Sequence, residues 1–233
     1  MASLHILSGG AAHGLVTSVK PTFQAIVGLD IEGEFGAVGI MAGKLRGGAA
    51  ADMVILTAAL IADLARENFV VASSVKDIGV VETALAVRAG DPPVAAPDGP
   101  ALREALRAAD AIFVPDTKAS TAGIHVASVL AKLGIDHEVA DRLKIFPNGA
   151  TAMRKLAASN AARPIGCTQA TEIIATEGVT LSAALPKGYE LTTVYTAAVA
   201  IKSGTPERAQ VLIDLLSGAE QRHLRTLAGF LEV

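Results

Sequence analysis

The chain has 233 residues, of which 51% are hydrophobic and only 3% aromatic, and its formal net charge at pH 7 is −3. This length allows one large domain or two smaller lobes, with cores built from aliphatic side chains. Positive and negative side chains are interspersed, so we expect no nucleic-acid partner and no membrane-surface partner. The single cysteine, Cys167, excludes an internal disulfide and a cysteine-based zinc site.

The most apolar segment with helical character, residues 53–65, is too short to cross a bilayer and contains Asp63. We therefore expect no membrane insertion. Residues 1–7 lead directly into a strand-like sequence, without the basic start and long apolar stretch of a secretory signal. This favours a cytoplasmic location, or a periplasmic one if a signal peptide has been removed.

Apolar strands and amphipathic helices alternate through the first part of the chain. Strands are expected at residues 4–7, 25–31, 52–56 and 80–87, and helices at residues 15–19, 40–45 and 58–68. A glycine-rich turn at 8–14 follows the first strand, and a glycine-containing turn at 34–39 follows the second. Residues 90–100, rich in proline and glycine, then form the clearest compositional boundary.

The second part of the chain continues this alternation. Strands are expected at residues 111–114, 144–146, 180–185 and 191–201, with a strand end at 164–170 that runs into a helix through residue 175. Helices are expected at residues 100–109, 124–133, 137–143, 150–159, 206–216 and 220–228. Such alternation indicates the α/β class with mostly parallel sheets.

Ligands of these sheets bind outside the carboxyl ends of the strands. Four turns of small or hydroxyl-bearing residues fall at such positions, at residues 8–12, 36–39, 120–123 and 167–170. In a strand-to-helix turn, the free N–H groups of the first helical turn and the partial positive charge of the helix favour an anion. We expect the four turns to converge on one site, although a capped helix without a ligand is the alternative for the turn at 120–123 taken alone.

Four stretches give the chain a resemblance to a known family. They are residues 4–11, 35–45, 48–55 and 165–169, which begin Leu-His-Ile-Leu, Phe-Gly-Ala-Val, Gly-Ala-Ala-Ala and Ile-Gly-Cys-Thr. Through them nearly the whole chain resembles the type-II periplasmic solute-binding proteins. It looks most like the molybdate-binding protein family, whose relatives include aconitate isomerase.

The resemblance implies a two-lobed fold, each lobe a mostly parallel sheet flanked by helices, that closes on an oxyanion by hinge bending. Lobe one would comprise residues 1–84 and 196–233, and lobe two residues 85–195. The crossover strands would lie near residues 83–87 and 193–198. The expected partner is a small-molecule anion, together with an ABC permease if the protein is exported.

The chain departs from the molybdate-binding pattern at residues that would contact the ligand. The hydroxyl that the family presents near Gly10 is offered here by Ser8, and two serines are replaced by Ala37 and Val38. The tyrosine of the fourth turn aligns with Cys167. Each oxygen of an oxyanion left without a donor costs on the order of 1–3 kcal/mol, so molybdate and tungstate are disfavoured. A small organic carboxylate fits better, held at the helix N-termini of the first and third turns.

We therefore predict binding of a small organic anion in a cleft between the lobes. The residues expected to bind it are Ser8, Gly9, Gly10, Ala37, Val38, Ser120, Thr121, Ala122, Gly149, Thr168 and Gln169. No cofactor and no metal are expected. The acidic and histidine residues at 136–141 indicate a solvated helix start, and the turn at 8–14 lacks the spacing of a dinucleotide-binding loop.

An isomerase acting on an unsaturated di- or tricarboxylic acid in the same cleft is the alternative, suggested by the resemblance to aconitate isomerase. Such a reaction needs one group that removes a proton and returns it elsewhere. His13 and Lys118 are the candidate catalytic residues, with His125 and Asp116 as further candidates. Each histidine also fits a structural role. A third alternative is the ligand-sensing domain of a transcription regulator, although no helix-turn-helix or basic stretch supports it.

Overall fold

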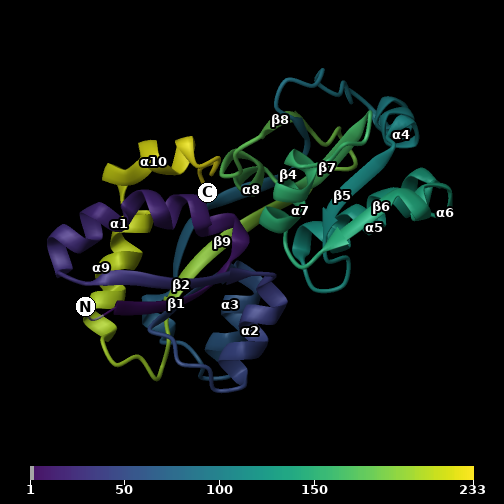
Figure 1. The fold of residues 1–233 in the computed structure, drawn as a ribbon. Coiled ribbons are helices and arrows are strands. Elements are labelled where there is room, and N and C mark those ends of the chain that lie inside the picture. Colours follow the sequence, from purple (N-terminus) through teal and green to yellow (C-terminus); the bar gives the residue numbers. More distant parts are fainter. Residues whose placement is uncertain (1–2) are drawn as a thin grey trace. The chain divides into compact units, whose positions relative to one another are not determined.

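The computed structural model describes residues 3–233 and divides the chain into two compact units (Figure 1). Unit 1 consists of the chain up to Val81 together with Thr193–Val233, and unit 2 is Glu82–Thr192. The lobe boundaries predicted from the sequence, after residues 84 and 195, each lie three residues later in the chain than these unit boundaries. The chain passes between the units inside strand β4 (Lys76–Arg88) and at the start of strand β9 (Thr192–Val199).

Unit 1 contains a sheet with the strand order β2-β1-β3-β9. Strands β1 (Ser3–Gly9), β2 (Asp30–Gly36) and β3 (Met53–Thr57) are parallel, whereas β9 runs antiparallel to β3. The α-helices of this unit are α1 (His13–Val27), α2 (Val38–Arg46), α3 (Ala58–Arg66), α9 (Pro206–Ser217) and α10 (Arg222–Leu227). The 3₁₀ turns in unit 1 are η1 (Gly10–Ala12), η2 (Ala72–Ser74) and η4 (Ala219–Gln221).

The second strand predicted from the sequence, at residues 25–31, is wrong in its position. Helix α1 continues through Val27 and ends at Gly28, whose left-handed φ of 73° suits a glycine. Strand β2 then begins at Asp30. The error arises because a short apolar run fits a buried strand and a helical turn equally well. Pro21 accordingly lies inside α1.

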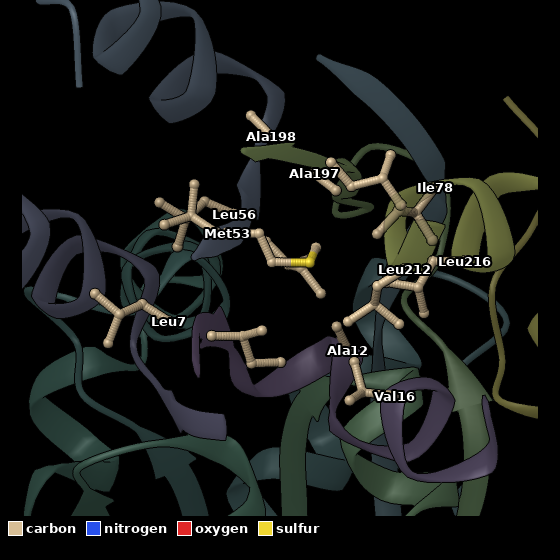
Figure 2. Close-up of a cluster of buried hydrophobic side chains, with 14 of the residues drawn as sticks. Leu7, Ala12, Val16, Met53, Leu56, Ile78, Ala197, Ala198, Leu212 and Leu216 are labelled. Carbon is tan, nitrogen blue, oxygen red and sulfur yellow. The ribbon is translucent and has the colours of Figure 1, made fainter. Parts of the chain in front are cut away.

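The core of unit 1 is mainly aliphatic, as the composition predicts. Side chains from both faces of the sheet belong to this core. In Figure 2, Met53 lies on the side of α1 and α9, with Val16, Leu212 and Leu216, whereas Leu7 and Leu56 lie on the other side. The labelled core residues are Leu7, Ala12, Val16, Met53, Leu56, Ile78, Ala197, Ala198, Leu212 and Leu216. Burial of such apolar surface is the main force that holds the two chain segments of this unit together.

Unit 2 contains strands in the order β8-β4-β7-β5-β6. Strands β5 (Ala111–Pro115), β6 (Leu143–Phe146) and β7 (Pro164–Gln169) are parallel, and β4 is antiparallel to both β7 and β8 (Val179–Ala184). The α-helices are α4 (Gly99–Ala108), α5 (Thr121–Leu133), α6 (Asp136–Val139), α7 (Gly149–Ala157) and α8 (Ala170–Ile174). The predicted helix at 137–143 is shorter than expected, because the 3₁₀ turn η3 (Ala140–Arg142) leads directly into β6.

The sheet of unit 2 is covered on both faces. Leu85, Ile165 and Cys167 belong to one cluster with residues of α5, including Val126 and Leu130. A second cluster contains the intervening residues Ala84 and Ala86 together with Met153 and Leu156 of α7. Because alternate residues of a strand point to opposite faces, α5 and α7 cover opposite sides of this sheet.

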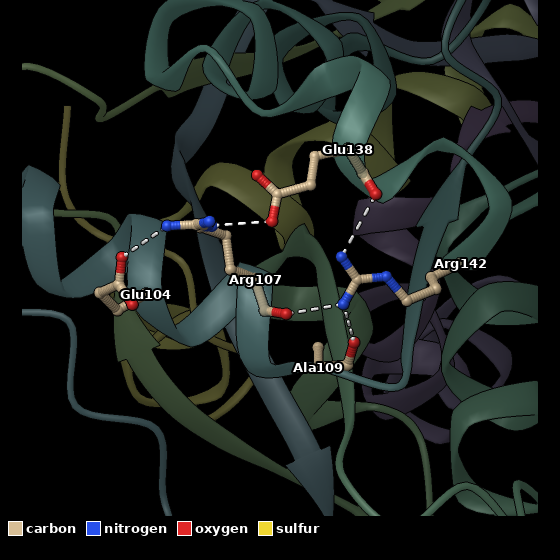
Figure 3. A network of polar contacts seen from close by, with 5 residues as sticks. All are labelled: Glu104, Arg107, Ala109, Glu138 and Arg142. Atoms are coloured by element: carbon tan, nitrogen blue, oxygen red, sulfur yellow. Dashed lines mark hydrogen bonds and ion pairs between the residues drawn. The ribbon is translucent and has the colours of Figure 1, made fainter.

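A polar network ties α4 to the segment after α5 (Figure 3). The Nη1 group of Arg142 donates to the backbone carbonyls of Arg107 and Ala109 at 2.6 and 2.7 Å. Arg107 forms ion pairs with Glu104 and Glu138. The carbonyl of Arg107 in the last turn of α4 and that of the C-cap residue Ala109, which lack partners within the helix, thereby gain one.

None of the helices within residues 3–233 is long and apolar enough to cross a membrane. The same residues contain no group of three or more His, Cys, Asp or Glu side chains that could hold a metal ion.

Candidate functional site

The two predicted turns of unit 1 lie side by side. In the parallel pair β1–β2, Ser8 is aligned with Phe35 and Gly9 with Gly36. The chain then enters η1 and α1 after β1, and α2 after β2. Both turns therefore leave the sheet at the same carboxyl edge, where the ligands of α/β sheets bind.

The surroundings of Gly9 are tightly packed. A Cβ atom at this position would lie 2.7 Å from Cγ1 of Val38 and 2.8 Å from Cε1 of Tyr195, so only glycine fits. Tyr195 lies on β9 and was not predicted as a site residue, because its sequence context indicates only an alternating strand. No local pattern could have brought it next to Gly9.

The predicted ligand residues of unit 1 offer few free hydroxyl donors. Ser8 is fully buried, and its Oγ donates to the carbonyl of Gly9 at 2.9 Å. Ala37 and Val38, at the start of α2, are buried and apolar. Backbone N–H groups at the starts of the helices remain the principal donors on this side.

Three helices of unit 2 begin beyond the carboxyl ends of its parallel strands. Pro115, the last residue of β5, is aligned with Phe146, the last residue of β6. Phe113 of β5 is aligned with Gly166 of β7. Helix α5 follows β5, α7 follows β6 and α8 follows β7. The predicted turns at 120–123 and 167–170 are thus brought to one edge of unit 2.

These helices differ in how their first turns are capped. Asn148 caps α7, because its Oδ1 accepts a hydrogen bond from the backbone N–H of Thr151 at 2.8 Å. Ser120, the N-cap residue of α5, makes no such side-chain bond. The first turn of α5, which includes the predicted residues Thr121 and Ala122, therefore keeps its N–H donors available for another acceptor.

The first turn of α7 already holds an acidic side chain of the protein itself. The carboxyl of Glu172, which is 6% exposed, accepts a hydrogen bond from the Oγ1 of Thr168 at 2.6 Å. It is also hydrogen-bonded by the backbone of Gly149, Ala150 and Gln169. Burial raises the pKa of the Glu172 carboxyl above its usual value, and these donors offset only part of that effect.

This internal contact bears on two predicted ligand residues, Gly149 and Thr168. Both direct their donors to Glu172, so a ligand at this helix would compete with a buried carboxyl. Their role in binding stays a prediction. Glu172 itself was not singled out in the sequence, because an acidic residue near a helix start normally indicates an exposed position.

Gln169 is the most unusual of the predicted residues. Its side chain is 2% exposed, and neither Oε1 nor Nε2 has a hydrogen-bond partner in the described part of the chain. Thr83, aligned with Gln169 across the β4–β7 pair, is 1% exposed and its Oγ1 also lacks a partner there. Buried polar atoms are nearly always hydrogen-bonded in native proteins, so these three atoms make this part of unit 2 the candidate binding site.

The candidates for proton transfer come from both units. His13 is exposed in unit 1, where its ring makes an edge contact with Phe35 at 4.7 Å, and Lys118 is exposed in unit 2. The Nε2 of His125 lies 2.7 Å from the carbonyl of Tyr189, and the Oδ1 of Asp116 accepts from the backbone N–H of Lys118 at 2.7 Å. The last two contacts are structural.

Cys167 is fully enclosed by apolar side chains. Burial raises the pKa of its thiol to about 12. The thiol therefore stays protonated at neutral pH, the form that is the weaker nucleophile.

Known proteins show the same overall organisation. A family model described as bacterial extracellular solute-binding protein matches residues 4–231. The chain belongs to this family. The relationship confirms the resemblance noted in the sequence and the α/β fold expected from it.

Proteins similar to this chain carry names that record different ligands or activities. The aconitate isomerase of a Pseudomonas species is 24% identical over 226 residues, which cover 94% of this chain and 83% of the isomerase. The periplasmic molybdate-binding protein of Azotobacter vinelandii has a TM-score of 0.83 at 15% identity, with 99% of both chains covered. The sulfate-binding protein of Mycobacterium tuberculosis has a TM-score of 0.76 at 20% identity, covering 99% of this chain and 86% of its own. These solute-binding structures establish a type-II periplasmic binding protein fold.

Proposed function

We propose that this solute-binding protein binds a small organic carboxylate, anchored at the N-terminus of helix α5. The observation that carries the proposal is the buried, unpartnered side chain of Gln169 at the edge of the sheet where α5 begins. Free N–H donors and the partial positive charge of the first turn favour an anion there. That the carboxylate binds in a cleft between the two lobes stays a prediction.

The composition of the site favours a carboxylate over molybdate, tungstate or sulfate. A tetrahedral oxyanion needs many oriented donors, but Ala37 and Val38 supply no side-chain donor and the hydroxyl of Ser8 serves the carbonyl of Gly9. At α7 the donors already serve Glu172. A carboxylate needs fewer donors and has an organic part that apolar side chains can contact.

A thermal-shift screen tests this proposal. Mono-, di- and tricarboxylates are compared with molybdate, tungstate and sulfate at equal ionic strength. A ligand present at about 100 times its dissociation constant stabilises the folded protein by roughly 2.7 kcal/mol. A carboxylate that raises the melting temperature is the expected result. The proposal is wrong if only the inorganic oxyanions do so, or if no anion does.

A second candidate function is isomerisation of an unsaturated di- or tricarboxylic acid, favoured by the similarity to aconitate isomerase along 94% of the chain. His13 and Lys118 are the residues proposed to move the proton. Incubation with trans-aconitate in deuterated water would reveal the reaction as isomer formation or as C–H exchange. His13→Ala and Lys118→Ala would show which group acts, and absence of both signals in the unmodified protein argues against catalysis.

An ABC permease is proposed as the macromolecular partner if the protein is exported. Otherwise a cytoplasmic location stays our prediction.

A further inference from the structure

The position of Gln169 constrains the kind of carboxylate that the protein can bind. Gln169 is the last residue of β7 and the N-cap residue of α8, and its backbone is extended, with φ −61° and ψ 134°. The alternation of side chains along β7 therefore extends to this residue. Thr168 faces α7, because its Oγ1 bonds Glu172 beside Gly149.

Gln169 consequently lies on the opposite face, with Ile165 and Cys167. Those two side chains pack in the same cluster as Val126 and Leu130 of α5. Thr83 shares this face, because it lies directly across from Gln169 and two residues before Leu85 of the same cluster. The amide of Gln169 and the hydroxyl of Thr83 are thus placed on the side of the sheet that α5 covers.

The amide of Gln169 needs two different partners. Its Nε2 group donates and its Oε1 accepts, and both are buried without a partner in the residues that the structure describes. A plain carboxylate has only acceptor oxygens at neutral pH, so it satisfies Nε2 and leaves Oε1 unpaired. A ligand that completes this site must carry a donor next to its carboxylate.

A hydroxyl group supplies that donor better than an ammonium group does. The N-terminus of α5 carries partial positive charge, which disfavours a cation beside it. We infer that the ligand is a 2-hydroxy carboxylic acid, whose hydroxyl donates to Oε1 of Gln169 while its carboxylate accepts from Nε2 and from the first turn of α5. Thr83 is placed to bond the same hydroxyl. This inference rests on the proposed carboxylate binding.

The test compares acids that differ only by the hydroxyl group. Dissociation constants are measured by calorimetry for lactate against propionate and for malate against succinate. The hydroxy acid of at least one pair is expected to bind about 10-fold tighter or more, because the analogue without a hydroxyl leaves a buried acceptor unpaired. Gln169→Met, which keeps the length of the side chain but removes both polar atoms, is expected to bring that ratio to within about 2-fold of unity.

Two further variants keep the result interpretable. Thr83→Val tests recognition of the same hydroxyl from the neighbouring strand and is also expected to reduce the ratio. It replaces Gln169→Met as the test if that variant does not fold. Gln24→Met, at an exposed position of α1, is the matched control and should leave the ratio unchanged. Equal binding of both acids in each pair, or a ratio that neither site variant changes, overturns this inference and leaves carboxylate binding standing. If no carboxylate binds at all, the proposed function fails first.

Discussion

Gly149 shows how closely the buried carboxyl of Glu172 is packed. A Cβ atom at Gly149 would lie 1.9 Å from Oε2 of Glu172 and 2.1 Å from Oγ1 of Thr168, which are polar atoms of buried side chains. Gly149→Ala is expected to lower the free energy of unfolding by about 1–3 kcal/mol, the usual cost of overpacking. Gly43→Ala, at an exposed site of α2 with nothing within 4 Å of the new methyl group, should instead raise it by about 0.5–1 kcal/mol. Urea unfolding measures both, and a Gly149 variant as stable as the parent contradicts this packing.

The protonation of Glu172 gives a second residue-level prediction. Its pKa is raised in the folded protein, so the folded state holds a proton that the unfolded state releases as the pH rises above the ordinary value of 4.5. The free energy of unfolding then falls with rising pH in that range, by at most about 1.4 kcal/mol per pH unit. Glu172→Gln stays uncharged and lacks this slope. Its stability relative to the parent should therefore increase from pH 5 to pH 8.

The measurement is urea unfolding of the parent and the Gln variant at several pH values. The amide will cost some stability at every pH, because its NH₂ group faces backbone donors. Only the change with pH reports protonation, and a difference that is constant from pH 5 to pH 8 would show that Glu172 is already ionised in the folded protein.

Part of the candidate site could be predicted from individual residues, and part could not. The small and hydroxyl residues that follow a strand identified Gln169 and the start of α5, because strand ends and helix starts are local features of a sequence. Glu172 and Tyr195 were missed because their importance comes from Gly149 and Gly9, which are distant in the chain. The roles of Glu172 and Tyr195 depend on their burial. A single sequence does not show whether an isolated polar residue is buried.

At the level of elements, the two helices α4 and α5 differ in what their N-cap residues do. Asp98 caps α4, since its Oδ1 accepts from the backbone N–H of Ala101 at 2.8 Å. Ser120 makes no corresponding bond to α5. Asp98→Ala should therefore cost about 1 kcal/mol of stability, whereas Ser120→Ala should cost a few tenths at most. Thermal unfolding measures both, and equal losses would mean that Ser120 serves as an ordinary cap in solution.

Most elements could be predicted because their ends carry strong local signals. Pro100 follows Asp98 and Gly99 at the start of α4, and Pro115 ends the apolar run of β5. The predicted strand at 25–31 failed for the opposite reason. It contains Gly28, which ends a helix, but the apolar residues before it fit both periodicities.

At the level of the whole molecule, unit 1 is assembled from two segments that are far apart in the chain. Leu212 of α9 comes from the C-terminal segment, is fully buried and belongs to the same core as Leu7 and Met53 of the N-terminal segment (Figure 2). Unit 2 has core clusters of its own, which include Leu102 of α4. A cavity in either core should therefore weaken mainly the unit that contains it.

Leu212→Ala and Leu102→Ala test this organisation as a matched pair, because each removes a fully buried leucine from one core. Each is expected to cost about 2–5 kcal/mol. In native-state hydrogen exchange, Leu212→Ala should lower the protection of the amides in β1 and β3, although these strands belong to the other segment of the chain. Leu102→Ala should act mainly on β5 and β7. If both variants lowered protection equally throughout residues 3–233, the two cores would form one cooperative folding unit and would not be stabilised separately.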